Sequence, residues 1–153
     1  AASTPTAQWA GKIGVNMQSS TLVFDETGKP FHVQQAEQIR AYKEAYKAAG
    51  HARTPRVSVS RSIFPLVNDL DVTYFGRGAS EDHFGYIEPK KLAAFGRSYA
   101  DMPENLIEQL RGDEGIQEAD TLLLTVPNQL GVDYNAHVIE SVVKLIAPAL
   151  GWR

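Results

Sequence analysis

The hydrophobic residues of this chain recur at two spacings, one typical of helices and the other typical of strands. The clearest helical pattern runs over 31–49, where apolar side chains return every three or four residues and charged side chains occupy most of the remaining positions. Pro5 follows a serine and a threonine that can cap a helix, and it predicts the start of an earlier helix. Pro103 predicts the start of another, and 134–150 carries the pattern of a final helix.

Three segments have the pattern of strands. At 56–64, valines alternate with serines between two prolines, and 15–19 is a second, shorter candidate. The apolar run at 121–126 is typical of a parallel strand that is buried on both faces. Helices and strands thus alternate as in the βα units of a parallel sheet. This order fits a small open α/β domain as well as part of a barrel.

The segment 66–100 has a less regular pattern, and we interpret it as an insertion between the second and third strands. We expect a helix over 67–74, a turn at 76–78 and a second helix over 89–99.

Composition and charge exclude several classes of function. The 153 residues carry a net charge of −3, so the chain lacks the basic surface that nucleic acid or an acidic membrane requires. The absence of cysteine excludes disulfides and thiolate chemistry and agrees with a reducing cytoplasm. No apolar run approaches the roughly 20 residues of a membrane span. We therefore expect a cytoplasmic protein with no nucleic-acid partner and no membrane partner.

The sequence lacks the usual motifs for metals, dinucleotides and catalytic triads. Its four histidines fall outside HxH and HExxH spacings, so we predict no metal site. The glycines at 76 and 78 lack the spacing of a dinucleotide or phosphate-loop fingerprint. No serine, histidine and aspartate can be assigned to a triad, and the catalytic residues stay unknown.

Several stretches resemble the luciferase-like monooxygenase family, in its branch of flavin-dependent oxidoreductases. The likeness is carried by ASTPTAQWA at 2–10 with GVNM at 14–17, by RVSVSRSIF at 56–64, and by LLLTVPNQLGVDYNAH at 122–137 with APALGW at 147–152. It extends over essentially the whole chain. The resemblance implies a TIM-type (β/α)8 barrel that binds FMN or a deazaflavin and works as a dimer or a larger oligomer.

The resemblance also implies that the chain is the C-terminal portion of such a barrel. A complete barrel needs roughly 250 residues, and the three strand candidates would be its sixth, seventh and eighth. We therefore expect an α/β fold with about three parallel strands and flanking helices, in a single partial domain over 1–153 with an insertion around 66–100. Alone, such a chain would be inactive. It would form homo-oligomers or pair with its missing N-terminal half.

Ser3, Thr4 and Thr6 are the candidate cofactor-binding residues. They would follow a strand and open a helix, where free N–H groups and the helix dipole favour an anion. In the family, the turn at this place holds the flavin phosphate, and Ser3 and Thr6 match its hydroxyl positions. Pro5 departs from some members and removes one donor. The structural alternative is a helix cap with nothing bound.

Arg61 and Asn128 are candidates for the substrate pocket. Arg61 lies on a predicted strand, where its guanidinium could contact an anionic substrate or a flavin oxygen; a structural ion pair is the alternative that we favour. Asn128 follows the last strand, on the side of a barrel where the chemistry takes place. It fits a turn that ends in a helix cap equally well.

Three functions are consistent with the sequence and with the resemblance. The first is an FMN-dependent monooxygenase or oxidoreductase that acts on a small organic substrate, to which this chain contributes the flavin phosphate site and one wall of the pocket. The second is a deazaflavin-dependent hydride-transfer enzyme with the same barrel. The third is a catalytically silent chain that acts only through self-association.

Overall fold

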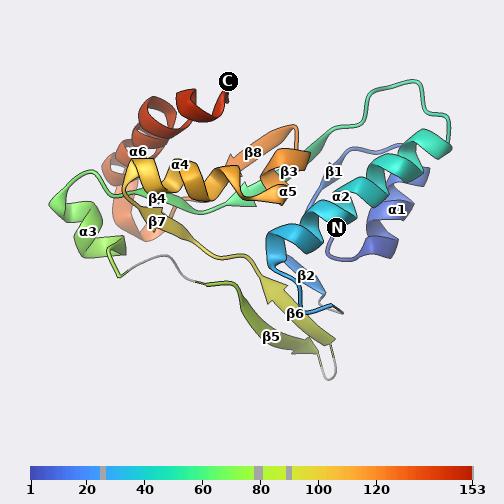
Figure 1. Ribbon diagram of the computed structural model, residues 1–153, viewed down its shortest axis with the longest axis horizontal. Coiled ribbons are helices and arrows are strands. Elements are labelled where there is room, and N and C mark those ends of the chain that lie inside the picture. The colour runs from blue at the N-terminus through green and yellow to red at the C-terminus, as the bar shows by residue number, and fades with distance from the viewer. Residues whose placement is uncertain (25–26, 78–80, 89–90, 153) are drawn as a thin grey trace. The chain divides into compact units, whose positions relative to one another are not determined.

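The computed structural model describes residues 1–24, 27–77, 81–88 and 91–152 (Figure 1). These residues form two compact units, each assembled from three stretches of the chain. The first unit contains Ala1–Ser60, Asp82–Gly96 and Asp113–Leu123, and the second contains Arg61–Glu81, Arg97–Gly112 and Leu124–Arg153.

Three parallel strands form a sheet that lies, apart from the last residues of two strands, in the first unit. They are β1 (Met17–Gln18), β3 (Val57–Arg61) and β8 (Thr121–Leu124), in the order β1-β3-β8. Val57 and Val59 are buried and the serines that alternate with them, Ser58 and Ser60, are half-buried, as the alternating pattern predicts. The prediction of an α/β fold with about three parallel strands is therefore confirmed.

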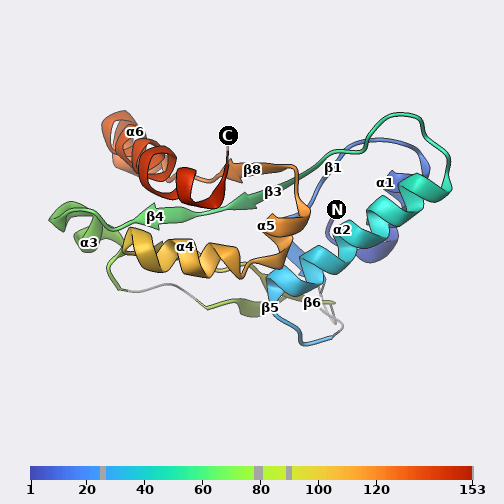
Figure 2. The ribbon, with the colours of Figure 1, turned by 45° about the horizontal axis from the view of Figure 1, so that its top comes forward.

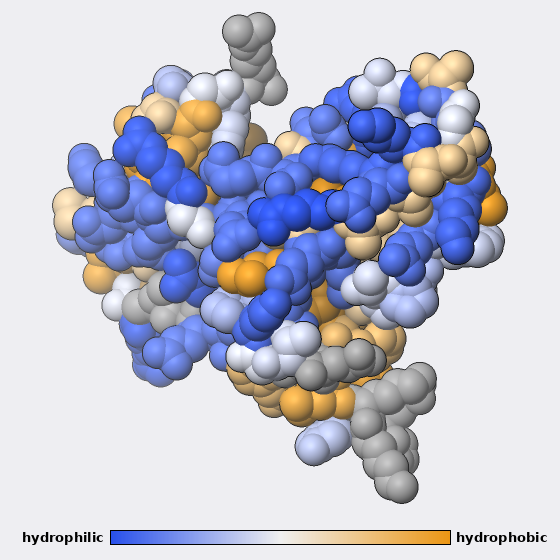
Figure 3. All heavy atoms as spheres, turned by 45° about the vertical axis from the view of Figure 1, so that its right-hand side comes forward, coloured by the Kyte–Doolittle hydropathy of each residue, from blue (hydrophilic) through white to orange (hydrophobic). Residues whose placement is uncertain are grey.

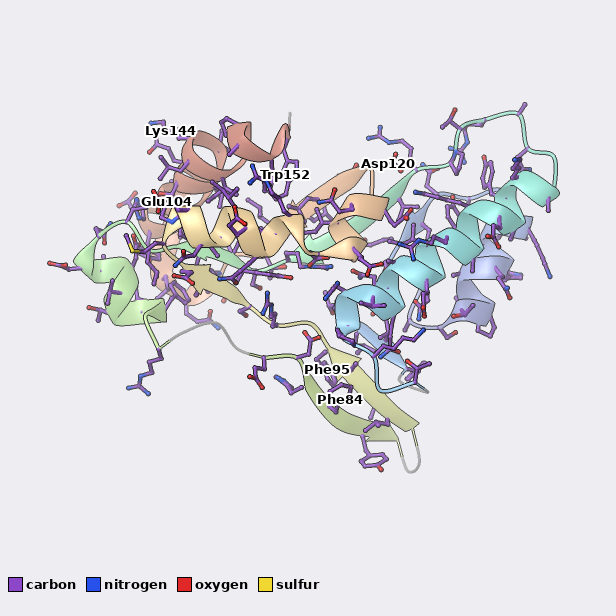
Figure 4. All side chains as sticks on the ribbon, viewed as in Figure 1. Phe84, Phe95, Glu104, Asp120, Lys144 and Trp152 are labelled. Atoms are coloured by element: carbon purple, nitrogen blue, oxygen red, sulfur yellow. The ribbon has the colours of Figure 1, made fainter. Side chains whose placement is uncertain are left out.

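The strand β8 is less buried than its sequence predicts. Leu123 is 41% exposed, and its neighbours in the strand are half-buried. The expectation of a strand covered on both faces is wrong here; among the described residues β8 pairs with β3 alone and stands at the edge of the sheet. Asp120, just before β8 (Figure 4), holds the start of the strand in place. Its carboxylate accepts a hydrogen bond of 2.8 Å from the N–H of Val57.

Two helices of the first unit pack closely against each other (Figure 2). They are α1 (Thr4–Lys12) and α2 (Phe31–Ala48), and both confirm the predicted helices. A Cβ added to Gly11 would lie 2.5 Å from the carbonyl oxygen of Tyr42. Glycine is therefore what allows the two backbones to approach so closely.

Ion pairs join α2 to the short helix α5 (Glu114–Glu118). Nε of Arg40 lies 2.8 Å from Oε1 of Glu118, and Nζ of Lys43 lies 3.0 Å from Oε2 of the same residue. The hydrogen bond from Arg40, with help from Lys43, holds the pKa of Glu118 below its ordinary value. Because the partners are partly exposed, these pairs fix the position of α5 more than they stabilise the fold.

A three-stranded antiparallel sheet completes the first unit. It consists of β2 (Leu22–Phe24), β6 (Lys91–Phe95) and β5 (His83–Glu88), in this order. The helix predicted over 89–99 is therefore wrong: 91–95 is a strand, and 89–90 lies outside the described residues.

Tertiary pairing explains why this segment is not a helix. Ala94 of β6 is fully buried and packs with Val23 of β2 and Phe31 of α2. Alanine favours a helix by local propensity. Here that preference is outweighed by a strand partner about 70 residues earlier in the chain, a contact that local propensity does not encode.

The second unit contains a parallel pair of strands and several helices. Its strands are β4 (Ile63–Pro65) and β7 (Tyr99–Asp101), and its α-helices are α3 (Asp69–Phe75), α4 (Pro103–Arg111) and α6 (Gly131–Ser141). The helices confirm the predictions at 67–74, at Pro103 and at 134–150, although the last one ends irregularly. It continues through a π-helical turn and a 3-10 turn.

The predicted strand 56–64 is divided between two sheets. Its first part is β3, whereas its end belongs to β4, which pairs with β7. Phe64 of β4 packs in a core cluster with Ala100, Tyr134 and Val138, and its ring stacks on that of Phe75 at 3.9 Å between centroids. In the described part of the chain, no helix has both the length and the apolar character needed to cross a membrane.

Candidate functional site

The helix α1 begins at the carboxyl edge of the parallel sheet. The amino group of Ala1 donates a hydrogen bond of 2.6 Å to the carbonyl oxygen of Gln18, and the N–H of Ser20 donates one of 2.8 Å to the carbonyl oxygen of Ala1. Ala1 thus lies alongside the end of β1 in the manner of a parallel strand. The carboxyl edge is where α/β proteins place their ligands.

Ser3, Thr4 and Thr6 lie together at the start of this helix, as predicted. Ser3 is the N-cap, and its Oγ accepts a weak hydrogen bond of 3.4 Å from the N–H of Thr6 and lies 3.0 Å from the Thr6 hydroxyl. Pro5 has no N–H, so the free backbone donor closest to the cap is that of Thr4. The first turn contains no acidic residue that would repel an anion.

A pocket of about 140 Å³ opens at this helix start. Its walls come from the N-cap and start of α1, from the end of β2 and Thr27, and from the first half of α2: Ser3, Thr4, Pro5, Phe24, Thr27, Gln34, Glu37 and Gln38. Thr6 is not among them. Pockets that hold whole ligands measure roughly 300–1,000 Å³. This pocket therefore has room for one polar group of a ligand, such as a phosphate and the atoms next to it.

The α2 side of the pocket is polar although much of it is buried. Gln34 is 5% exposed and donates a hydrogen bond of 2.7 Å to the carbonyl oxygen of Lys29. Gln38 is 4% exposed, and its Oε1 is buried without a hydrogen-bond partner among the described residues. Glu37 is paired with Lys29 at 2.6 Å, so its negative charge is offset.

The second unit contains a cluster that sequence reasoning missed. The buried carboxylate of Asp71 accepts hydrogen bonds from the Tyr134 hydroxyl at 2.7 Å, from Nε2 of His137 at 3.0 Å, and from the N–H groups of Val67 and Asn68 at 3.0 and 3.1 Å. Asp71 belongs to α3, and the two side-chain donors belong to α6. Its signal in the sequence is the N-x-x-D of a capping box, which the structure contains in full.

These contacts change the proton affinities of both acids. Burial acts to raise the pKa of Asp71, but the hydrogen bonds from Tyr134, Val67 and His137 outweigh it and hold this pKa below its ordinary value. Burial, and then the bond to Asp71, raise the pKa of the Tyr134 phenol. Asp71 is therefore a stable anion at neutral pH, and Tyr134 is a stable donor.

His137 is the member of this cluster with an accessible side chain. Its side chain is 31% exposed, and the contact of Nε2 with Asp71 favours the tautomer in which Nε2 carries the proton. The lone pair is then on Nδ1. A histidine oriented by a carboxylate is the arrangement of a general base, and the same contacts also serve to join α3 to α6.

Arg61 and Asn128 both belong to the second unit, whereas Ser3, Thr4 and Thr6 belong to the first. Arg61, the last residue of β3, is 4% exposed. Asn128 is exposed and opens a 3-10 turn, Asn128–Leu130, which precedes α6. The turn expected after the last strand is thus present, and a contact of either residue with a substrate stays a prediction. Among the described residues, no three histidine, aspartate or glutamate side chains are grouped as a metal ion would need.

Comparison with known proteins does not assign the chain to a family. No protein-family model matches the sequence, and no curated protein is significantly similar to it.

Proposed function

We propose that this chain is part of an FMN-dependent, luciferase-like monooxygenase or oxidoreductase, and that it contributes the flavin phosphate site. The observation that carries the proposal is the position of Ser3 and Thr4. Both lie at the N-terminus of α1, line a pocket whose wall also contains polar side chains of α2, and follow Ala1, which lies beside the carboxyl end of β1. A phosphate there would accept hydrogen bonds from the two hydroxyls and from the N–H of Thr4, in the field of the helix dipole.

The order of the parallel strands supports the barrel that the proposal requires. In a (β/α)8 barrel, strands that follow one another along the chain are also neighbours in the sheet. Doubly wound sheets reverse the order at a switch point. The order β1-β3-β8 contains no such reversal, so it agrees with part of a TIM-type barrel, as it does with one half of a doubly wound sheet.

The residues at the pocket would bind and orient the cofactor. When bound, reduced FMN supplies the chemistry that activates dioxygen toward a small organic substrate. The pocket of about 140 Å³ suits the phosphate end of FMN and is too small for the flavin ring. Arg61 and Asn128 are proposed as contacts of the substrate in the second unit. A deazaflavin with the same phosphate is the alternative cofactor, and the absorbance spectrum of the purified protein distinguishes the two.

Titration with FMN and with riboflavin tests the phosphate assignment. We expect Ser3→Ala combined with Thr4→Val to weaken FMN binding at least about tenfold, because charged hydrogen bonds are lost. Riboflavin, which has no phosphate, should bind the variant and the original protein equally. Thr54→Val is the matched control, since Thr54 is an exposed threonine of the same unit outside the pocket. An unchanged FMN affinity in the double variant would refute the assignment.

Self-association is a second candidate function, favoured by the hairpin of the first unit. Phe84, Tyr86 and Ile87 of β5 are 47%, 72% and 47% exposed, and Figure 3 shows apolar side chains gathered over this hairpin. Phe84 and Phe95 lie on its two neighbouring strands (Figure 4). Exposed apolar surface on an edge strand favours association. Light scattering tests this candidate, and a monomer that is unchanged at high concentration would refute it.

A further inference from the structure

His137, in the second unit, has one ring nitrogen without a partner. Its Nε2 lies 3.0 Å from Oδ1 and 3.2 Å from Oδ2 of Asp71, so we assign the proton to Nε2 and the lone pair to Nδ1. Nδ1 has no hydrogen-bond partner among the described residues, and the side chain is 31% exposed. The contact that joins α6 to α3 therefore uses Nε2 alone and leaves Nδ1 free to react.

The carboxylate that orients this ring is itself fixed. Asp71 is 1% exposed and accepts hydrogen bonds from the N–H groups of Val67 and Asn68. The hydroxyl of Tyr134 is a further donor to it. A fixed carboxylate directs the lone pair of Nδ1 and stabilises a positive charge that develops on the ring. No hydroxyl of the described residues donates to Nδ1, so the imidazole has no serine or threonine to activate and can act as the nucleophile itself.

The charges around the ring disfavour an anionic reactant. Those of Asp71 and Glu140 both interact with that of His137. Lys144 is paired with Glu140 and offsets it, whereas the ion pair of Asp71 is with the ring itself. A phosphoryl group or another anion would be repelled by this carboxylate. A neutral electrophile, such as the carbonyl carbon of an ester, would not.

Aromatic rings lie close to the imidazole. The ring centroid of Tyr134 is 5.6 Å from that of His137, and Tyr74 stands edge-on to Tyr134 at 5.0 Å between centroids. Tyr74 is 48% exposed. Rings in such arrangements favour contact with a further aromatic group. An ester with an aryl group therefore matches these surroundings better than a purely aliphatic one.

We propose that His137 is a nucleophile that hydrolyses small neutral aryl esters, with Asp71 as its positioning residue. Nδ1 attacks the carbonyl carbon, the bond from this carbon to the aryl oxygen breaks, and the aryloxide leaves with the electron pair. The acyl group is then on Nδ1, and the positive charge of the ring faces the carboxylate of Asp71. Water attacks the acyl carbon, the bond to Nδ1 breaks, and the carboxylic acid leaves while the neutral imidazole is restored. All these residues belong to the second unit, so this activity is independent of the flavin phosphate site.

Release of 4-nitrophenolate from 4-nitrophenyl acetate by the full chain tests this activity. His137→Gln should lower the rate at least about tenfold, because the amide can still donate to Asp71 but has no nucleophilic nitrogen. His83→Gln is the matched control, since His83 is an exposed histidine of the first unit, and it should leave the rate unchanged. A rate no higher than that of the buffer, or equal losses in the two variants, would overturn the proposal.

Acylation by diethyl pyrocarbonate tests the nucleophile without any variant. Mass spectrometry of the original protein should show His137 modified first among the four histidines, and NMR should locate the added group on Nδ1. His83 is more exposed than His137. If His83 reacts first, exposure alone sets the order and the proposal is wrong.

The same reagent tests Asp71 as the positioning residue. Below its unfolding transition, Asp71→Asn should be modified on both ring nitrogens of His137, because the ring has lost the carboxylate that holds the proton on Nε2. A purely structural role for Asp71 would leave Nδ1 as the modified atom, and that result would refute the positioning. If this variant does not fold, the order of modification in the original protein still decides whether His137 is the nucleophile.

Discussion

The hydroxyl of Tyr134 donates a hydrogen bond of 2.7 Å to Oδ1 of Asp71, although 63 residues separate the two in the sequence. The bond joins α6 to α3 within the second unit. Its acceptor is a carboxylate that is 1% exposed and that also binds the N–H groups of Val67 and Asn68. One buried anion thus fixes a loop and two helices, and it makes the stability of this unit sensitive to a single side chain.

Replacement of Asp71 by asparagine should destabilise the protein by about 2–4 kcal/mol. An amide keeps the shape but has one acceptor oxygen, so it cannot serve both the N–H groups of Val67 and Asn68 at Oδ2 and the two side-chain donors at Oδ1. Denaturant unfolding measures the change. Asp69→Asn is the control because Asp69 is an exposed aspartate on the same helix. A difference of less than about 1 kcal/mol between the two variants would contradict a central role for Asp71.

The same carboxylate makes stability depend on pH in acid. The pKa of Asp71 is lower in the folded protein than its ordinary 3.8. Its contribution is therefore fully present above that value, and it is lost as the pH falls through the lower folded pKa. We expect the difference in unfolding free energy between the original protein and Asp71→Asn to be constant from about pH 5 upward and to shrink below about pH 4. A difference that grows in acid would contradict a pKa of Asp71 that is lower in the folded protein than in the unfolded one.

Ser3→Asp should separate the helix cap from phosphate binding. Aspartate caps a helix as well as serine does, so the unfolding free energy should stay within about 0.5 kcal/mol, whereas Ser3→Ala should cost about 1 kcal/mol. Its negative charge would, however, repel a phosphate in the pocket, and FMN affinity should fall more than for Ser3→Ala. Parallel unfolding and FMN titrations measure both effects. If Ser3→Asp binds FMN with unchanged affinity, Ser3 caps the helix and has no part in phosphate binding.

Gly11→Ala should be strongly destabilising. The added Cβ would meet the carbonyl oxygen of Tyr42 at 2.5 Å and the nitrogen of Tyr46 at 2.9 Å, so α1 and α2 would have to separate. We expect a loss of about 2 kcal/mol or more in thermal or denaturant unfolding. At Gly112, the closest atom to an added Cβ is 3.5 Å away. Gly112→Ala should therefore be neutral or stabilising by up to about 1 kcal/mol, and equal losses at both positions would rule out this explanation.

Several features of the fold could be predicted because they depend on neighbours in the sequence. Serine and threonine before Pro5 define the start of α1, and apolar spacing over 31–49 defines α2. The hairpin strand at 91–95 could not be predicted in this way. Its alanines are favourable in a helix, and the pairing with β2 that makes them a strand involves residues far away in the chain.

The candidate sites also include one feature that depends on adjacent residues and others that depend on residues far apart in the chain. The sequence by itself determined the capped helix start at Ser3, because a cap and its first turn are a few adjacent residues. Only the tertiary structure decided that Gln38 lies in the wall of the same pocket, and that His137 and Tyr134 meet at Asp71. Burial and hydrogen bonding between distant segments produce these arrangements. No sequence pattern reveals which of these residues meet. The number of residues between them in the chain depends on the helices and strands that lie between, and not on the contact itself.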